Sequence, residues 1–134
     1  MMEGTMSPFA IFLKQLRLSR GFRQKALAHQ LGYEPSYLSA LERSEKGPPR
    51  QDFIQRLIKG LNLNEMEQQE LISALDASRR QISLPVKAST AEYDLIRKLE
   101  KQLGQLQPLQ IQLIEMALKI SEAMPSNSHH SAKH

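Results

Sequence analysis

The sequence contains no cysteine, and this absence excludes disulfide bonds, thiolate chemistry and cysteine-ligated zinc sites together. It also lacks any apolar run near the ~20 residues that a membrane-spanning helix needs. The N-terminal segment MMEGTMSP does not have the basic and then apolar order of a secretory signal. We therefore expect a cytoplasmic protein without membrane association, whose stability comes from packing alone.

Motifs for enzyme chemistry are also missing. The chain has no glycine-rich phosphate loop and no paired-carboxylate motif, and His29 is the one histidine before the C-terminal tail. The sequence shows no nucleophile that would pair with His29 in catalysis, so we expect this histidine at the surface. The tail carries His129, His130 and His134, but a flexible tail supplies no fixed metal geometry. We predict no enzyme activity, no metal site and no cofactor.

Composition and charge place the chain among globular proteins. Its 134 residues are 40% apolar and 24% charged, which suits one domain, or one small domain with an extension. Residues 1–60 hold ten Lys and Arg against five acids, whereas residues 61–134 hold eight against nine. The positive field of the first segment would attract phosphates and make binding salt-dependent. The alternative is a basic surface that only increases solubility.

Apolar periodicity and capping signals predict five helices within residues 1–80. The first begins at Ser7-Pro8, and Gly21 ends it. The fifth begins at a capping-box pattern formed by Asn64 and Glu67. The five helices are expected at about residues 8–20, 24–31, 35–44, 51–61 and 65–79.

Residues 23–47, RQKALAHQLGYEPSYLSALERSEKG, indicate two short helices joined by a tight turn. Ala28 lies where the helices cross and only a small side chain fits, and Gly32 can adopt the left-handed conformation that ends a helix. Pro35 suits the first turn of the next helix. Four leucines at helical spacing would fill the core between the helices: Leu27, Leu31, Leu38 and Leu41. This pattern is typical of a helix-turn-helix motif that reads DNA.

A second helical region follows a proline-containing linker at residues 81–88. Ser89 and Glu92 form a capping-box pattern for a sixth helix that Gly104 should end, and Pro108 starts a seventh. We expect residues 89–124 to form a helical hairpin and residues 125–134 to be a flexible tail.

The seventh helix is apolar over more than one narrow stripe, so it needs two covering surfaces. The sixth helix can supply one, and a second subunit is the favoured other. In the alternative, the hairpin packs on the first domain of its own chain. The residues expected in a dimer contact are Leu99, Leu103, Leu113, Ile114, Ala117 and Leu118.

The stretch from about Pro8 to Leu63 resembles the phage-repressor-like regulators of the Xre or Cro family. The residues that carry the resemblance, in the correct mutual spacing, are Arg17, Gln24, Ala28, Gly32, Ser36, Leu38, Ser39 and Glu42. It implies an all-α protein, with a five-helix repressor-like DNA-binding domain in residues 1–80 followed by the C-terminal helical hairpin. It also implies a structural ion pair between Arg17 and Glu42.

The resemblance places base reading on the helix that begins near Pro35. The candidate residues are Glu34, Pro35, Ser36, Tyr37, Ser39 and Ala40. Many relatives carry Gln, Arg or Asn at the positions of Pro35, Ser36 and Ala40. The three side chains found here cannot form two hydrogen bonds to one purine edge. Glu34 could accept from a cytosine amino group, and Ala40 could touch a thymine methyl. Tyr37 either stacks on sugar and phosphate or packs under the preceding helix. Direct readout is therefore sparse, and DNA shape or water shares the work.

Phosphate contacts are expected from residues around the motif. Gln24 begins the second helix, where the family places a contact to the DNA backbone. Arg23 stands where relatives often have a Ser or Thr cap, and it offers a cation instead. The phosphate-binding candidates are Arg23, Gln24, Arg43, Lys46 and Arg50, ahead of Arg20 and Lys25.

These features predict a sequence-specific transcriptional regulator, a repressor, that binds double-stranded DNA. It would bind a palindromic operator as a homodimer, with half-sites about one helical turn (~10 bp) or a multiple of it apart. The alternative is an antitoxin-like protein whose C-terminal hairpin binds a partner protein, while the N-terminal domain only autoregulates. A small-molecule pocket would fit only at a dimer interface.

Overall fold

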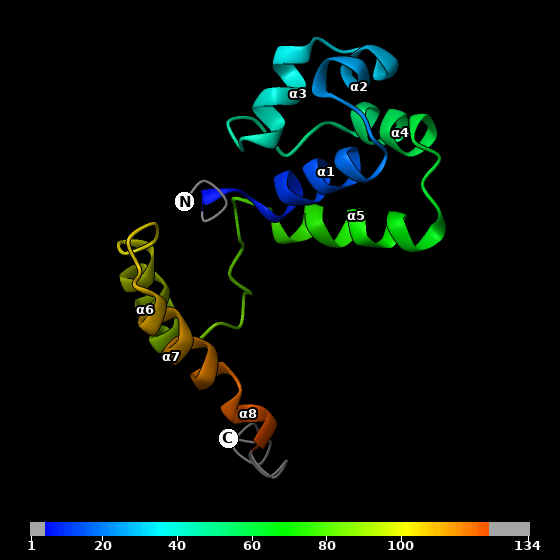
Figure 1. Ribbon diagram of the computed structural model, residues 1–134. Coiled ribbons are helices and arrows are strands. Elements are labelled where there is room, and N and C mark those ends of the chain that lie inside the picture. The colour runs from blue at the N-terminus through cyan, green and yellow to red at the C-terminus, as the bar shows by residue number, and fades with distance from the viewer. Residues whose placement is uncertain (1–4, 124–134) are drawn as a thin grey trace. The chain divides into compact units, whose positions relative to one another are not determined.

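The computed structural model describes residues 5–123, so the predicted tail at 125–134 and its three histidines lie outside the described residues. The fold is all-helical over this range, as the sequence predicts (Figure 1). The helices are α1 (Pro8–Ser19), α2 (Gln24–Leu31), α3 (Pro35–Glu42), α4 (Gln51–Gly60), α5 (Glu65–Ala77), α6 (Thr90–Glu100), α7 (Pro108–Leu118) and α8 (Ile120–Ala123). The chain divides into two compact units between Ser83 and Leu84.

Side-chain caps start several helices where the sequence indicates. Ser7 accepts a hydrogen bond from the Ala10 N–H at the start of α1. Complete capping boxes join Asn64 to Glu67 before α5 and Ser89 to Glu92 before α6. Because each cap satisfies an N–H that the helix leaves unpaired, the starts of these helices are fixed locally.

Helix ends agree less well with the sequence. The prediction that Gly104 ends α6 is wrong by four residues, because α6 stops at Glu100. The amides of Gln102 and Leu103 bond carbonyls only three residues back, so the chain tightens into turns before Gly104 takes its φ of 90°. The expected seventh helix is also interrupted, since α7 ends at Leu118 and α8 begins at Ile120.

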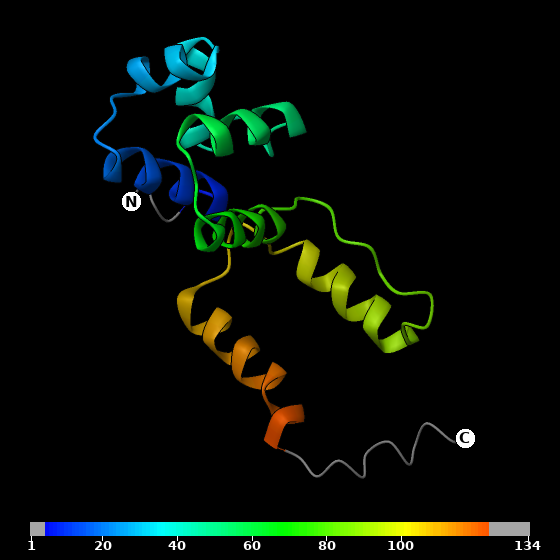
Figure 2. The ribbon, with the colours of Figure 1, turned by 90° about the vertical axis from the view of Figure 1, so that its right-hand side faces the viewer.

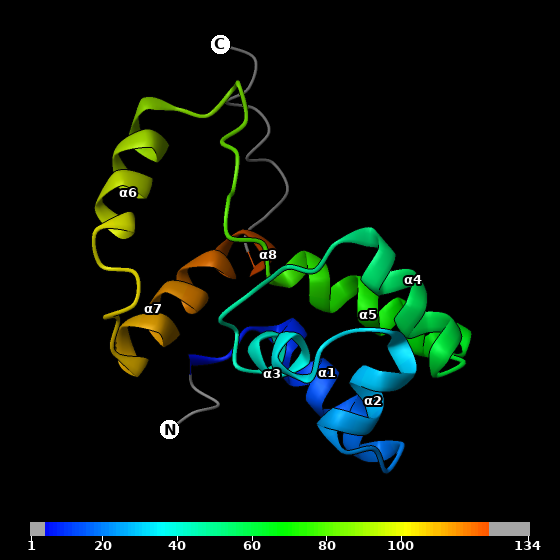
Figure 3. The same ribbon diagram turned by 90° about the horizontal axis from the view of Figure 1, so that it is seen from above.

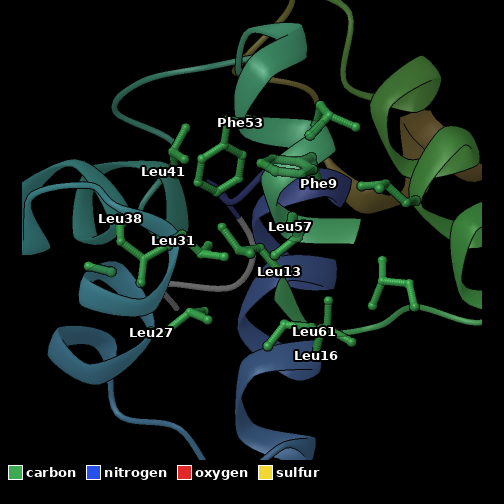
Figure 4. Packing of buried hydrophobic residues seen from close by; sticks show 14 residues of the cluster. Phe9, Leu13, Leu16, Leu27, Leu31, Leu38, Leu41, Phe53, Leu57 and Leu61 are labelled. Carbon is green, nitrogen blue, oxygen red and sulfur yellow. The ribbon is translucent and has the colours of Figure 1, made fainter. Parts of the chain in front are cut away.

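The core of the N-terminal unit lies between α1, α2, α3 and α4, and α5 closes it from below in Figure 1. The four leucines predicted to fill the helix-turn-helix core are at most 4% exposed. Figure 4 shows how residues from four helices meet there: Phe9, Leu13, Leu16, Leu27, Leu31, Leu38, Leu41, Phe53, Leu57 and Leu61. Helix α5 adds Leu71, which is fully buried.

The turn between α2 and α3 depends on Gly32. Its φ is 83°, and the Tyr33 N–H reaches back to the Ala28 carbonyl at 2.9 Å. A Cβ on Gly32 would lie 2.9 Å from Nη1 of Arg56, which itself donates to the Leu31 carbonyl at 3.2 Å. Only glycine combines this backbone conformation with this close approach, so the turn can direct α3 across α2.

Helices α1 and α5 lie side by side (Figures 1 and 2), and hydrogen bonds join them at both ends. The Phe9 N–H of α1 donates to Ser78 Oγ, just past α5, at 2.8 Å. At the other end, Arg20 makes two 2.9 Å hydrogen bonds to Glu67 and a third, of 3.2 Å, to the Leu61 carbonyl. The hydrogen bonds from Arg20 and from the Asn64 N–H lower the pKa of Glu67 to about 2.

Glu67 should therefore make unfolding depend on acid pH. Its carboxylate stabilises the folded state above its usual pKa of 4.5, and this stabilisation is lost as pH falls toward about 2. In urea denaturation, we expect Glu67→Gln to be less stable than the wild type at pH 7 and to lose less stability over that interval. Glu65→Gln, on the exposed first turn of the same helix, is the matched control. Parallel pH dependences for wild type and Glu67→Gln would contradict the account.

Candidate nucleic-acid interface

A buried ion pair joins α1 to α3. Nε of Arg17 lies 2.7 Å from Oε2 of Glu42, and Nη2 donates to Oε1 at 3.0 Å. The two residues are 7% and 2% exposed. The remaining guanidinium nitrogen of Arg17 donates to the Phe22 carbonyl at 2.8 Å, just before α2. Arg17 therefore serves the scaffold and is not presented at the surface to a phosphate.

Gln24, a predicted phosphate contact, belongs to the same network. Its Nε2 donates to Oε1 of Glu42 at 2.9 Å, and the side chain is half-buried at the start of α2. One carboxylate thus fastens α1, α2 and α3 together. A second amide hydrogen and the amide oxygen of Gln24 remain for other partners.

The start of α3 lies at the surface. Glu34 is the N-cap residue, but its side chain makes no capping hydrogen bond, and Pro35 is the first helical residue. Glu34, Pro35 and Ser36 are all exposed, whereas Ser39 is half-buried farther along the helix. Three of the predicted base-reading side chains are therefore displayed together at the tip of α3.

The prediction that Ala40 touches a base is wrong, because this residue is only 8% exposed. After α3 the chain folds back over it, and the amides of Glu45 and Lys46 donate to the Ala40 carbonyl at 2.9 and 3.4 Å. At this exposure Ala40 offers almost no methyl surface to a groove of DNA.

The sequence predicts that Tyr37 either stacks on sugar and phosphate or packs under the preceding helix, and its observed packing differs in part from both. Its ring packs with Tyr33, at a centroid distance of 5.3 Å, and with Phe53 of α4, at 5.7 Å. Tyr33 donates to Asp52 at 3.2 Å and lies under Arg56, 5.1 Å from the ring centre. Burial raises the pKa of both tyrosines. This aromatic cluster supports the tip of α3 from below.

Sequence reasoning missed Tyr33, although its four-residue spacing from Tyr37 was a usable signal. Tyr33 borders two surface hollows on either side of the α3 tip. The first is lined by Arg23, Lys25, Ala26, His29, Tyr33, Glu34 and Pro35. The second is lined by Tyr33, Tyr37, Lys46, Gly47, Pro48, Arg50 and Asp52. Cations at the start of α2 and in the α3–α4 loop therefore line the hollows beside the tip. Figure 3 shows the α2 and α3 helices and the connection from α3 to α4 from above.

The phosphate-binding candidates divide by their partners. Arg23, Lys46 and Arg50 are exposed, and none forms an ion pair with any residue between 5 and 123. Arg43 is instead held by Glu45 through hydrogen bonds of 3.0 and 2.8 Å, and it also donates to Ser39. This pairing raises the pKa of Arg43 and lowers that of Glu45. Among the five phosphate-binding candidates, the cations without an ion-pair partner between residues 5 and 123 are thus Arg23, Lys46 and Arg50, and the exposed Lys25 beside the first hollow has no such partner either.

Residues 8–71 match the model of a family described as a helix-turn-helix domain. No curated protein and no solved structure matches the chain. The match runs from the first residue of α1 to the buried Leu71 of α5, so it covers the aromatic cluster, both hollows and the buried ion pair. The match supports a helix-turn-helix domain in this part of the chain, and such domains are typical of DNA-binding regulators.

Two further findings concern the described part of the chain. None of its helices is long and apolar enough to cross a membrane. Between residues 5 and 123 there is also no group of three or more histidine, aspartate or glutamate side chains placed to hold a metal ion.

The buried pair makes a stability prediction. Glu42→Gln leaves the Arg17 charge buried beside a neutral amide, so we expect a loss of about 3–5 kcal/mol in the free energy of unfolding. Glu45→Gln removes the same charge from an exposed pair that solvent screens, so a much smaller loss is expected. Urea denaturation of both variants measures the difference. Similar small losses in the two variants would contradict a scaffolding role for the buried pair.

Proposed function

We propose that this chain is a sequence-specific DNA-binding transcriptional regulator whose helix α3 enters the major groove. The observation that carries the proposal is the exposed tip of α3, flanked on both sides by cations without ion-pair partners. Arg23 lies beside one hollow, and Lys46 and Arg50 lie beside the other. Cations in this position neutralise phosphates on the strands that border the groove.

Direct base readout would be limited. Glu34 can accept from a cytosine amino group, while the short hydroxyl of Ser36 bonds a base edge without selecting one. Pro35 offers only apolar contact. We therefore propose that the sequence-dependent shape of the DNA supplies part of the specificity. The loop cations would bind best to a duplex whose phosphates have the matching spacing.

We further propose that the protein acts as a homodimer on a palindromic operator. One helix-turn-helix domain contacts one half-site, so a two-fold operator requires two copies, with half-sites about 10 bp or a multiple of it apart. The resemblance to phage-repressor-like regulators supports repression as the outcome of binding.

A salt titration of DNA binding tests the position of the interface. With a duplex selected from a random pool, Lys46→Gln should bind more weakly to all sequences, and the slope of log affinity against log salt should fall in magnitude by about 1. Lys14→Gln removes the same charge from the exposed side of α1 and should leave the slope unchanged. Equal effects of the two variants, or binding insensitive to salt, would contradict the proposed interface.

A further inference from the structure

Most of α3 is committed to the fold, and one side of the helix remains open. The buried residues of the helix are Leu38, Ala40, Leu41 and Glu42. Tyr37 belongs to the aromatic cluster. Ser36, Ser39 and Arg43 follow one another at spacings of three and four residues, so they share the open side. Arg43 is the C-cap residue, and its N–H still bonds the Ser39 carbonyl at 3.1 Å, so the helical path extends to this position.

The Arg43 side chain folds back along this open side. Its Nε and Nη2 donate to the Glu45 carboxylate at 3.0 and 2.8 Å, and Nη1 donates to Oγ of Ser39, one turn nearer the tip. A guanidinium carries five N–H groups, two of them on each terminal nitrogen. One N–H therefore remains on Nη1 and one on Nη2. The side chain is 49% exposed, so a ligand can reach these two groups.

The Glu45 carboxylate makes this pair of N–H groups unsuited to a phosphate. It neutralises the charge of Arg43, and because its own side chain is 60% exposed it would repel an anion that approaches the guanidinium. O6 and N7 of guanine are uncharged acceptors whose spacing matches two nitrogens of a guanidinium. Phosphates have better partners in three cations that form no ion pair between residues 5 and 123: Arg23, Lys46 and Arg50.

We propose that Arg43 reads a guanine in the major groove through its two remaining N–H groups, and that Glu45 and Ser39 are positioning residues that hold the guanidinium for this contact. The inference rests on the proposed DNA binding, and it gives Arg43 a different role from the phosphate contact that the sequence predicts. A guanidinium already held by three hydrogen bonds loses little freedom when it binds. One direct base contact is thereby added to the limited readout by the tip of α3.

The other open side chains of α3 and of its tip cannot make this contact. Pro35 has no donor, and the hydroxyls of Ser36 and Ser39 each donate only one hydrogen bond. Glu34 can select a cytosine, whose partner base is also a guanine, but that contact leaves N7 of the guanine untouched. Dependence of binding on N7 therefore distinguishes Arg43 from Glu34.

The experiment measures binding of the full-length chain to a duplex selected from a random pool. In further versions of the duplex, one guanine at a time is replaced by 7-deazaguanine, which lacks the N7 acceptor. For the wild type, we expect one such replacement to weaken binding at least about fivefold. Arg43→Met keeps the length of the side chain and removes its donors, so the same replacement should then have an effect of less than about twofold. This variant should also lose the preference for guanine at that base pair alone.

Two further variants separate the roles of the neighbouring charges. Lys46→Gln is the matched control because it removes a cation assigned to phosphate. It should weaken binding to all duplexes and leave the effect of 7-deazaguanine as in the wild type. Glu45→Gln tests the positioning role. Removal of its charge should tighten binding to every duplex, whereas the ratio of the affinity for guanine to that for the other bases at the same pair should fall.

Three results would overturn the reading of guanine by Arg43. The first is a wild type insensitive to N7 at every guanine of the site, and the second is an N7 effect that Arg43→Met retains in full. The third is an equal loss by Arg43→Met on all sequences with a salt slope smaller by about 1, which would make Arg43 a phosphate contact.

An unchanged ratio in Glu45→Gln would refute the positioning role. If Arg43→Met does not fold, the wild-type series and the Glu45→Gln ratio still decide the matter. A wild type that selects no sequence from the pool would refute the proposed function, and this inference with it. A wild type that selects a sequence but shows no dependence on N7 would refute this inference alone.

Discussion

The carboxylate of Glu42 is the constraint on which the DNA-binding unit depends. It is almost fully buried, and Arg17 and Gln24 donate three hydrogen bonds to it, which offset the cost of burying a carboxylate. These donors come from α1 and α2, so the orientation of α3 is fixed by the same contacts that stabilise the charge. Once one side of α3 is committed to this network and to the leucine core, its tip and the exposed side of Ser36 are the parts left for a partner.

Charge pairing decides which cations are left for the phosphates of that partner. Arg20 holds α1 to α5 through Glu67, Arg43 is held by Glu45, and Arg56 supports the turn at Gly32. Net charge alone would count all of them as part of a positive surface. The structure separates these cations from Arg23, Lys46 and Arg50, whose exposed groups flank the tip of α3.

Local signals made much of the fold predictable, because caps and apolar spacing act within a few residues. Ser7, Asn64 and Ser89 mark helix starts correctly, and the buried leucines follow from periodicity. The errors arise where the burial or pairing of a residue depends on distant or irregular segments of the chain. Ala40 is buried because the loop after α3 folds back over it, and the pairing of Arg43 with Glu45 depends on side-chain geometry that no periodic pattern encodes.

The most direct test of the central claim is nuclear magnetic resonance of the full-length chain titrated with a duplex selected from a random pool. The account predicts that the largest backbone chemical-shift changes occur at Glu34, Ser36 and Tyr37, with smaller changes near Arg23 and across residues 46–50. Changes confined to α1 and α5, with the α3 tip unaffected, would contradict it.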